Sequence, residues 1–221
     1  MRRLPVLLAL VVVVLISGVL IFRDSAQSPQ WDEDALYAFV REEIKDISRS
    51  LFAEQWEIVY YDVTDDGHLE ALLVESYGVD WHPYVEIVSK AEGRYQRVPS
   101  KIHAGKYGTL VERRDGLLAV TTRTGGPGEE LAYLSLYAAD AGEVVSVLDN
   151  LLVYQRVAFP NADFEVQAEI TGSFSDFVYR QVKEDFVTGE ETVAVVQHFR
   201  YDPDGMRFEI SAKADESAAE M

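Results

Sequence analysis

Cysteine is absent from the 221 residues of this chain. Its absence excludes disulfide bonds, thiol nucleophiles, thiolate zinc sites, iron–sulfur clusters and a lipid anchor on cysteine. Without disulfides, the fold must be stabilised by packing alone or by a bound ion.

Positive charge is scarce, with 20 basic residues against 38 acidic ones and a net charge of −18. A protein this acidic does not attract nucleic acid or an anionic bilayer surface over long distances. Its charge favours cations and basic partners instead. Hydrophobic residues make up 48% of the chain, which excludes disorder on compositional grounds. The length is sufficient for one domain with a substantial core.

Recognisable catalytic patterns are also lacking. The four histidines form no H-x-H or H-x-x-x-H pair, and there is no G-x-S-x-G or S-x-x-K motif. The glycines at 125, 126 and 128 lack the Gly-Lys-Ser/Thr that completes a phosphate loop, and two glutamates follow them. A hydrolase that uses a pair of carboxylates remains an open alternative, because all 38 acidic residues follow the N-terminal apolar segment.

The N-terminal segment has the pattern of a membrane anchor. Residues 4–22 contain no charge, and as a helix these 19 residues would span about 28 Å, close to the hydrocarbon thickness of a bilayer. The run is long for a secretory signal and no A-x-A site follows it, so residues 1–23 are predicted to be a signal anchor, with a cleaved signal peptide as the alternative. Arg2 and Arg3 predict that the N-terminus lies on the cytoplasmic side of the cell membrane and that the C-terminal domain lies outside the cytoplasm.

An amphipathic helix is predicted over residues 32–56, after a polar linker at 24–31 that contains Ser28-Pro29. Three acidic residues at 32–34 suit a helix N-terminus. Apolar residues then recur every three or four positions and form one stripe, which we expect to face a sheet: Leu36, Val40, Ile44, Ile47 and Leu51.

Residues 57–213 have the pattern of a β-rich domain, and residues 214–221 that of a flexible tail. Short runs of β-branched and aromatic residues alternate with turn signals about every ten residues, and Asp115-Gly116 is a strong hairpin signal. We expect an antiparallel meander with strands near 57–62, 70–76, 84–90, 107–114, 117–122, 131–138, 164–170, 177–182, 193–200 and 208–212. The aromatic group at 81–84 is either an exposed ligand patch or a buried strand entry.

The stretch YYDVTDDGHLEALLV, residues 60–74, places acidic residues around Gly67 directly before an apolar strand. It resembles the acidic loop of FG-GAP and VCBS-type repeats, D-x-[DN]-x-DG-x-x-[DE], here in a single copy. The resemblance implies a calcium site with side-chain oxygens from Asp62, Thr64, Asp66 and Glu70 and the backbone carbonyl of His68. The alternative is an acidic turn whose carboxylates accept backbone hydrogen bonds without a metal.

The resemblance also implies a propeller-like sheet, but the 156 residues from 57 to 212 provide only about three blades. We therefore expect a mostly β fold that is a partial propeller, a strongly curved sheet or a sandwich, with the amphipathic helix covering an edge. The predicted function is a membrane-anchored extracytoplasmic binding or scaffolding domain without catalysis, with a protein or cell-surface ligand and no nucleic acid. The alternatives are a membrane-tethered hydrolase that uses acidic residues and a calcium-dependent adhesion or sensory module.

Overall fold

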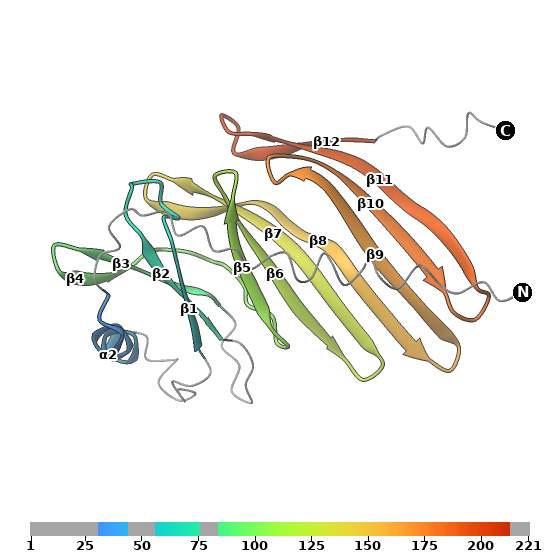
Figure 1. Ribbon diagram of the computed structural model, residues 1–221, viewed down its shortest axis with the longest axis horizontal. Helices are drawn as coiled ribbons and strands as arrows, with labels where there is room; N and C mark the ends of the chain where they lie inside the picture. The colour runs from blue at the N-terminus through green and yellow to red at the C-terminus, as the bar shows by residue number, and fades with distance from the viewer. Residues whose placement is uncertain (1–30, 44–55, 76–83, 213–221) are drawn as a thin grey trace, which may run out of the picture.

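The computed structural model describes residues 31–43, 56–75 and 84–212. These residues form two antiparallel sheets and one helix, and within each sheet every strand pairs with the next in the chain (Figure 1). The helix is α2, Glu33–Glu43, and the four-stranded sheet contains β1 Trp56–Tyr61, β2 Glu70–Glu75, β3 Glu86–Ala91 and β4 Arg94–Arg97. The eight-stranded sheet contains β5 Thr109–Arg114, β6 Leu117–Gly126, β7 Glu129–Asp140, β8 Glu143–Phe159, β9 Ala162–Ser173, β10 Asp176–Asp185, β11 Glu190–Asp202 and β12 Arg207–Ala212.

Helix α2 covers one face of the four-stranded sheet. Its N-terminus is capped by Asp32, whose Oδ1 accepts a hydrogen bond from the Ala35 backbone N–H at 3.1 Å. Leu36 and Val40 lie on one side of the helix and are fully buried against a group of sheet residues. That group consists of Ala71, Leu73 and Val88.

The opposite face of the four-stranded sheet packs against the eight-stranded sheet. Successive side chains of a strand point to opposite faces, so Leu72 and Val74 face away from the helix that Ala71 and Leu73 contact. They join a second core with Ile87 of β3 and with apolar residues from the first strands of the larger sheet. Those residues are Val111, Leu118, Val120, Tyr137 and Val144.

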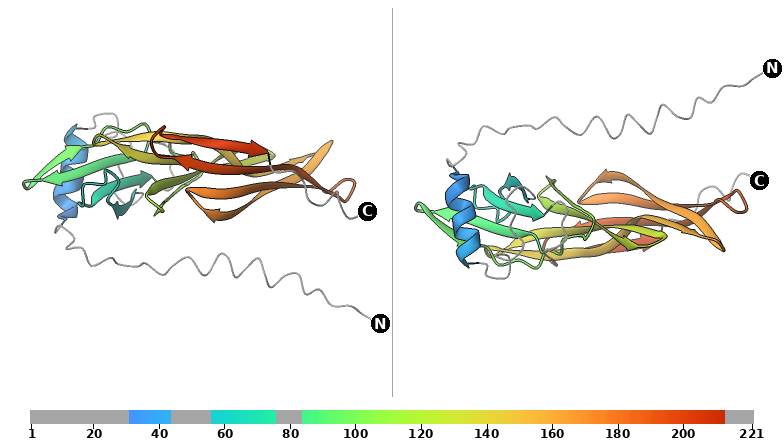
Figure 2. Two further views of the ribbon diagram at one scale, coloured as in Figure 1. Left: turned by 90° about the horizontal axis from the view of Figure 1, so that it is seen from above. Right: turned by 90° about the horizontal axis from the view of Figure 1, so that it is seen from below.

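The eight-stranded sheet folds over itself, so that its strands lie in more than one layer (Figure 2). Leu117 and Leu136, on the face of β6 and β7 away from the small sheet, pack in one cluster with Phe177 of β10 and Phe199 of β11. The rings of Phe177 and Phe199 stack with their centroids 4.9 Å apart. Because β6 and β7 contribute to cores on both of their faces, they form the central layer of the molecule.

A break in the ladder between β7 and β8 lies in this central part of the sheet. The register shifts between Ala132 and Tyr133 and again around Leu134–Leu136, and Asn150 of β8 has a positive φ of 55°. The buried Ser135 hydroxyl accepts a hydrogen bond from the Asn150 backbone N–H at 3.1 Å. Bulges bend a strand and increase its twist, which accounts for the curvature of this long sheet.

The structure confirms a mostly β, antiparallel and unclosed architecture with the Leu36–Val40 stripe facing a sheet. The predicted helix of residues 32–56 is present as Glu33–Glu43 among the described residues, and Ile44, Ile47 and Leu51 lie outside them. The predicted strands missed β4 and the 17-residue β8. No helix within the described part of the chain is long and apolar enough to cross a membrane, and residues 4–22 fall outside that part.

Substituting Phe199→Ala should lower the free energy of unfolding by about 3–5 kcal/mol, because the buried ring leaves a cavity between the two layers of the large sheet. Ile210→Ala on β12 removes an apolar side chain that is 53% exposed and should cost about 0.5 kcal/mol or less. Urea denaturation of both variants measures the difference. Equal losses would contradict the folded-over arrangement of the sheet.

Candidate functional site

The acidic loop connects β1 to β2 and is held by hydrogen bonds from its own backbone. Asp62 Oδ2 accepts one from the Gly67 N–H at 3.1 Å, and Asp66 Oδ1 accepts one from the His68 N–H at 2.8 Å. Asp65 and Gly67 have positive φ values of 57° and 84°, which turn the chain back toward β2. The predicted tight loop with Gly67 at its turn is therefore present.

Glu70 is buried at the base of this loop, with 1% of its surface exposed. Its Oε2 accepts hydrogen bonds from the backbone N–H groups of Val63 at 2.7 Å and Thr64 at 3.4 Å, and Thr64 Oγ1 donates to its Oε1 at 3.3 Å. Burial raises the pKa of Glu70, and the nearby Asp66 and Asp62 raise it further, while the backbone hydrogen bonds act in the opposite direction. The Glu70 carboxyl, at the end of the loop, is thus hydrogen-bonded to Val63 and Thr64 near its start.

Asp65 connects the loop to the large sheet. Its carboxylate forms an ion pair with the guanidinium of Arg113 on β5, 48 residues downstream. The sequence motif marks Asp65 only as an extra charge at a position that does not bind metal in the repeat. Its arginine partner was missed because no local spacing connects two residues that the fold brings together.

The predicted ligand oxygens are already engaged in this geometry. Among the described residues, no group of three or more His, Cys, Asp or Glu side chains is arranged to hold a metal ion. Both oxygens of Glu70 and one oxygen each of Asp62 and Asp66 accept protein hydrogen bonds, as in an acidic turn. Of the remaining oxygens, Asp62 Oδ1 is buried and has no hydrogen-bond partner. Calcium binding by Asp62, Thr64, Asp66, His68 and Glu70 therefore stays a prediction.

A second buried carboxylate, Glu86 on β3, also has a dedicated partner. It is 2% exposed, and Arg97 of β4 donates to it through Nε and Nη2, both at 2.8 Å. Glu70 lies on the same side of β2 as Leu72, which faces the large sheet. Glu86 is next to Ile87 in β3, so it points to the face opposite Ile87, toward the helix. The two buried carboxylates therefore point to opposite faces of the small sheet.

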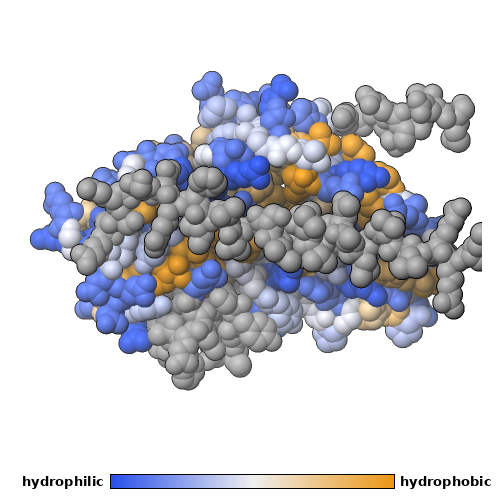
Figure 3. All heavy atoms as spheres, in the orientation of Figure 1, coloured by the Kyte–Doolittle hydropathy of each residue, from blue (hydrophilic) through white to orange (hydrophobic). Residues whose placement is uncertain are grey.

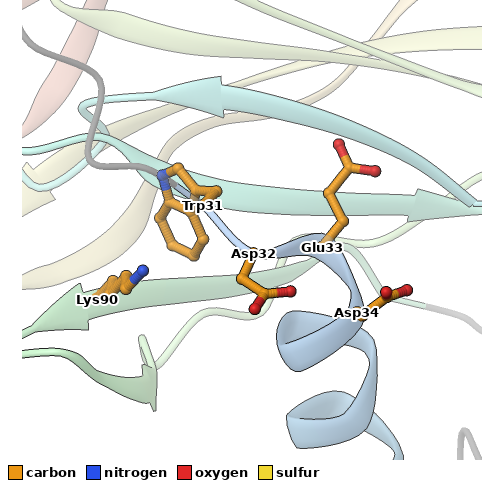
Figure 4. Close-up of a pocket in the computed structure, with 5 residues that line it drawn as sticks. All are labelled: Trp31, Asp32, Glu33, Asp34 and Lys90. Carbon is orange, nitrogen blue, oxygen red and sulfur yellow. The ribbon is translucent and has the colours of Figure 1, made fainter.

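An open hollow of about 670 Å³ lies beside the N-terminus of α2 (Figure 4). Its lining side chains do not converge on one point, since Glu33 and Asp34 point away from the indole of Trp31. The indole contacts the rings of Tyr60 and Tyr95, with centroids 5.4 and 5.7 Å away, and its Nε1 is buried without a hydrogen-bond partner. These contacts connect the start of the helix to the small sheet.

The predicted aromatic group at 81–84 is described only at Tyr84, which is 39% exposed. Its ring centroid lies 5.2 Å from that of His103, with which it forms an isolated β-bridge. The position is therefore an exposed strand entry, and residues 81–83 lie outside the described part of the chain.

No known protein family, curated protein or solved structure matches this chain. The resemblance of residues 60–74 to FG-GAP and VCBS repeats therefore rests on the motif alone.

The raised pKa of Glu70 predicts a pH effect on stability. Glu70 contributes stability that is complete below its ordinary pKa of 4.5 and is lost as the pH rises through the raised value. Glu70→Gln keeps a neutral acceptor for the Val63 N–H, so the variant should gain stability relative to the wild type as the pH rises from about 4.5 to 7. Denaturant unfolding across this range measures the difference.

The matched control is Glu143→Gln, which removes a carboxylate from the exposed β7–β8 turn and should leave a smaller pH effect. A constant difference between Glu70→Gln and the wild type at all pH values would contradict the raised pKa of Glu70.

Proposed function

We propose that this chain is a membrane-anchored extracytoplasmic domain that binds or scaffolds another molecule and does not catalyse a reaction. The observation that carries the proposal is the use of both buried carboxylates, Glu70 and Glu86, as structural acceptors. General acid–base catalysis needs a titratable group that can reach a substrate from a cleft. Glu70 and Glu86 instead lie under the protein surface, where their oxygens accept hydrogen bonds from backbone N–H groups, from the Thr64 hydroxyl or from Arg97.

The distribution of charge supports a binding role. Glu70 and Glu86 are the only buried acidic or basic side chains in the described part of the chain. The remaining described charges lie at least partly on the surface, and hydrophilic residues predominate among those coloured in Figure 3, with apolar patches between them. A surface with this net acidity attracts basic partners and repels acidic ones.

The hydrolase alternative requires two carboxylates on either side of a substrate. Glu70 and Glu86 point to opposite faces of one sheet, which makes them unsuitable as such a pair. The binding proposal therefore accounts for the arrangement of the buried acids better than the hydrolase alternative does.

The calcium-dependent adhesion or sensory alternative is favoured by one observation, the buried and unpartnered Asp62 Oδ1. A cation beside this oxygen would relieve the repulsion among Asp62, Asp66 and Glu70. If the alternative is correct, calcium at a hundredfold excess over its dissociation constant stabilises the fold by about 2.7 kcal/mol, and Asp66→Ala abolishes the gain.

The acidic-turn geometry predicts the opposite result. Calorimetric melts of the wild type should be identical with calcium and with chelator, and Asp66→Ala should cost only about 0.5–1.5 kcal/mol in either buffer through loss of the His68 N–H contact. Thr121→Ala, a matched small change on β6 away from the loop, controls for a general effect of calcium. A calcium-dependent gain that Asp66→Ala removes would replace the acidic turn with a metal site.

The absence of cysteine allows a direct test of location and binding. Asp204→Cys on the β11–β12 turn and Val187→Cys on the β10–β11 turn each introduce a single thiol at an exposed position. A membrane-impermeant maleimide should label both variants in intact cells, and a maleimide photo-crosslinker should produce a discrete adduct with another cellular molecule. Labelling only after lysis would contradict the location, and labelling without an adduct at either site would contradict the binding role.

A further inference from the structure

Strand β11 has an open edge along half of its length. It spans 13 residues, and β12 pairs only with its residues 197–202. On one side residues 190–193, 195 and 196 pair with β10, with a bulge at Ala194, and no described strand pairs with them on the other side. Figure 1 shows β11 continuing well beyond the end of β12 at this edge. A strand that lies at such an edge leaves alternate backbone N–H and C=O groups available for an added strand.

The side chains along this open edge are exposed. Residues 190–194 all lie on the surface, and Val193 is 43% exposed. The adjoining β10–β11 turn presents Val187, which is 70% exposed, whereas the ring of Phe186 packs against the guanidinium of Arg156 on β8. The open backbone therefore adjoins exposed apolar side chains at Val187 and Val193.

Acidic residues lie in register across the strands that lead to this edge. Glu165 of β9 is opposite Glu184 of β10, which is opposite Glu191 of β11. In the next row, Asp185 is opposite Glu190. Like charges directly opposite each other destabilise a sheet, so this arrangement costs stability in the free protein.

Only some of these carboxylates are compensated within the protein. Asp185 Oδ1 accepts hydrogen bonds from the backbone N–H groups of Val187 and Thr188 at 2.9 and 3.0 Å. No ion pair formed by a described residue involves Glu184, Glu190 or Glu191. Glu165 accepts a hydrogen bond from the Tyr154 hydroxyl at 3.3 Å and faces Arg156 in register. The negative charge therefore accumulates toward the open edge.

We propose that residues 190–196 of β11 are a docking site for an extended basic segment of another polypeptide, which adds to the large sheet as a further strand. The inference rests on the proposed binding function and names its surface and its class of partner. Backbone hydrogen bonds to the open edge provide the affinity, as in other cases of strand addition. Side chains that face the acidic rows provide the specificity.

The register specifies the chemistry of the partner. Lysine or arginine opposite Glu190 and Glu191 would extend both acidic rows with the opposite charge. The residue opposite Val193, two positions from the one opposite Glu191, would lie on the same face and be apolar. The partner segment therefore carries two adjacent basic residues next to alternating β-branched residues.

Charge also selects against two other occupants. A second copy of the chain carries the same net charge of −18, and residues 213–221 of this chain, KADESAAEM, contain three acidic residues and one lysine. Either would bring further carboxylates to the acidic rows. Charged residues at an edge commonly prevent self-association of a sheet, and here they leave the edge open to a basic strand.

A synthetic peptide tests the inference with the full chain in nanodiscs of neutral phosphatidylcholine. The probe has the sequence Thr-Val-Thr-Val-Thr-Lys-Lys with blocked ends and a fluorophore, and its binding is followed by anisotropy. Hydrogen exchange locates the site. We expect saturable binding that weakens with salt, with new protection of the backbone amides in residues 190–196.

Two matched comparisons separate backbone from charge. Two isomeric peptides, N-methylated at one or the other set of alternate amides, should differ in affinity by roughly tenfold or more, because only one set faces β11. Glu191→Gln should weaken binding about two- to five-fold, whereas Glu143→Gln, which removes the same charge from the β7–β8 turn, should leave it unchanged.

Other outcomes overturn the inference in distinguishable ways. Binding with protection elsewhere would reject this edge but leave the proposed binding function intact. No binding by the full chain would reject the basic-strand partner, and gain of binding on deletion of residues 213–221 would identify the tail as the occupant. A concentration-dependent dimer with residues 190–196 protected would identify a second copy. Adducts in the cysteine crosslinking experiment test the binding function independently.

Discussion

The double-sided burial of β6 and β7 is the constraint on which the rest of the structure depends. Leu118 and Val120 pack toward the small sheet, while Leu117 and Leu136 pack toward the folded-over part of the large sheet. Without the first contact the small sheet and α2 would have no support, and without the second β10–β12 would expose their aromatic residues. With no disulfides available, this central layer connects the apolar cores that hold the fold together.

The acidic composition is compatible with such a packed interior because charge is kept almost entirely outside it. The exceptions are Glu70 and Glu86, and each is surrounded by donors that replace the lost water. Burying a carboxylate without donors would cost several kcal/mol, so the fold requires these hydrogen bonds. Because of the same cost, Glu184, Glu190 and Glu191 lie on the surface, where their charge can act on a partner.

Local patterns in the sequence predicted most of the individual elements. The apolar stripe predicted the buried side of α2, and Asp115-Gly116 predicted the hairpin between β5 and β6, where both residues have positive φ values of 54° and 77°. The same approach missed β8, in which Asp149-Asn150 has the composition of a turn but lies within a strand. A bulge held by Ser135 from the neighbouring strand accommodates it, and no local pattern reports such a partner.

The sequence by itself determined the class of the fold, the sign of its surface charge and the position of the acidic loop, because each follows from composition or from spacing within about ten residues. Only the tertiary structure decided how the acids are used. Glu70 is turned inward to backbone donors, Asp65 is paired with Arg113, and Glu165, Glu184 and Glu191 are aligned across three strands. These relations depend on strand register and on contacts between distant segments, and a one-residue change of register would reverse the face of every side chain involved.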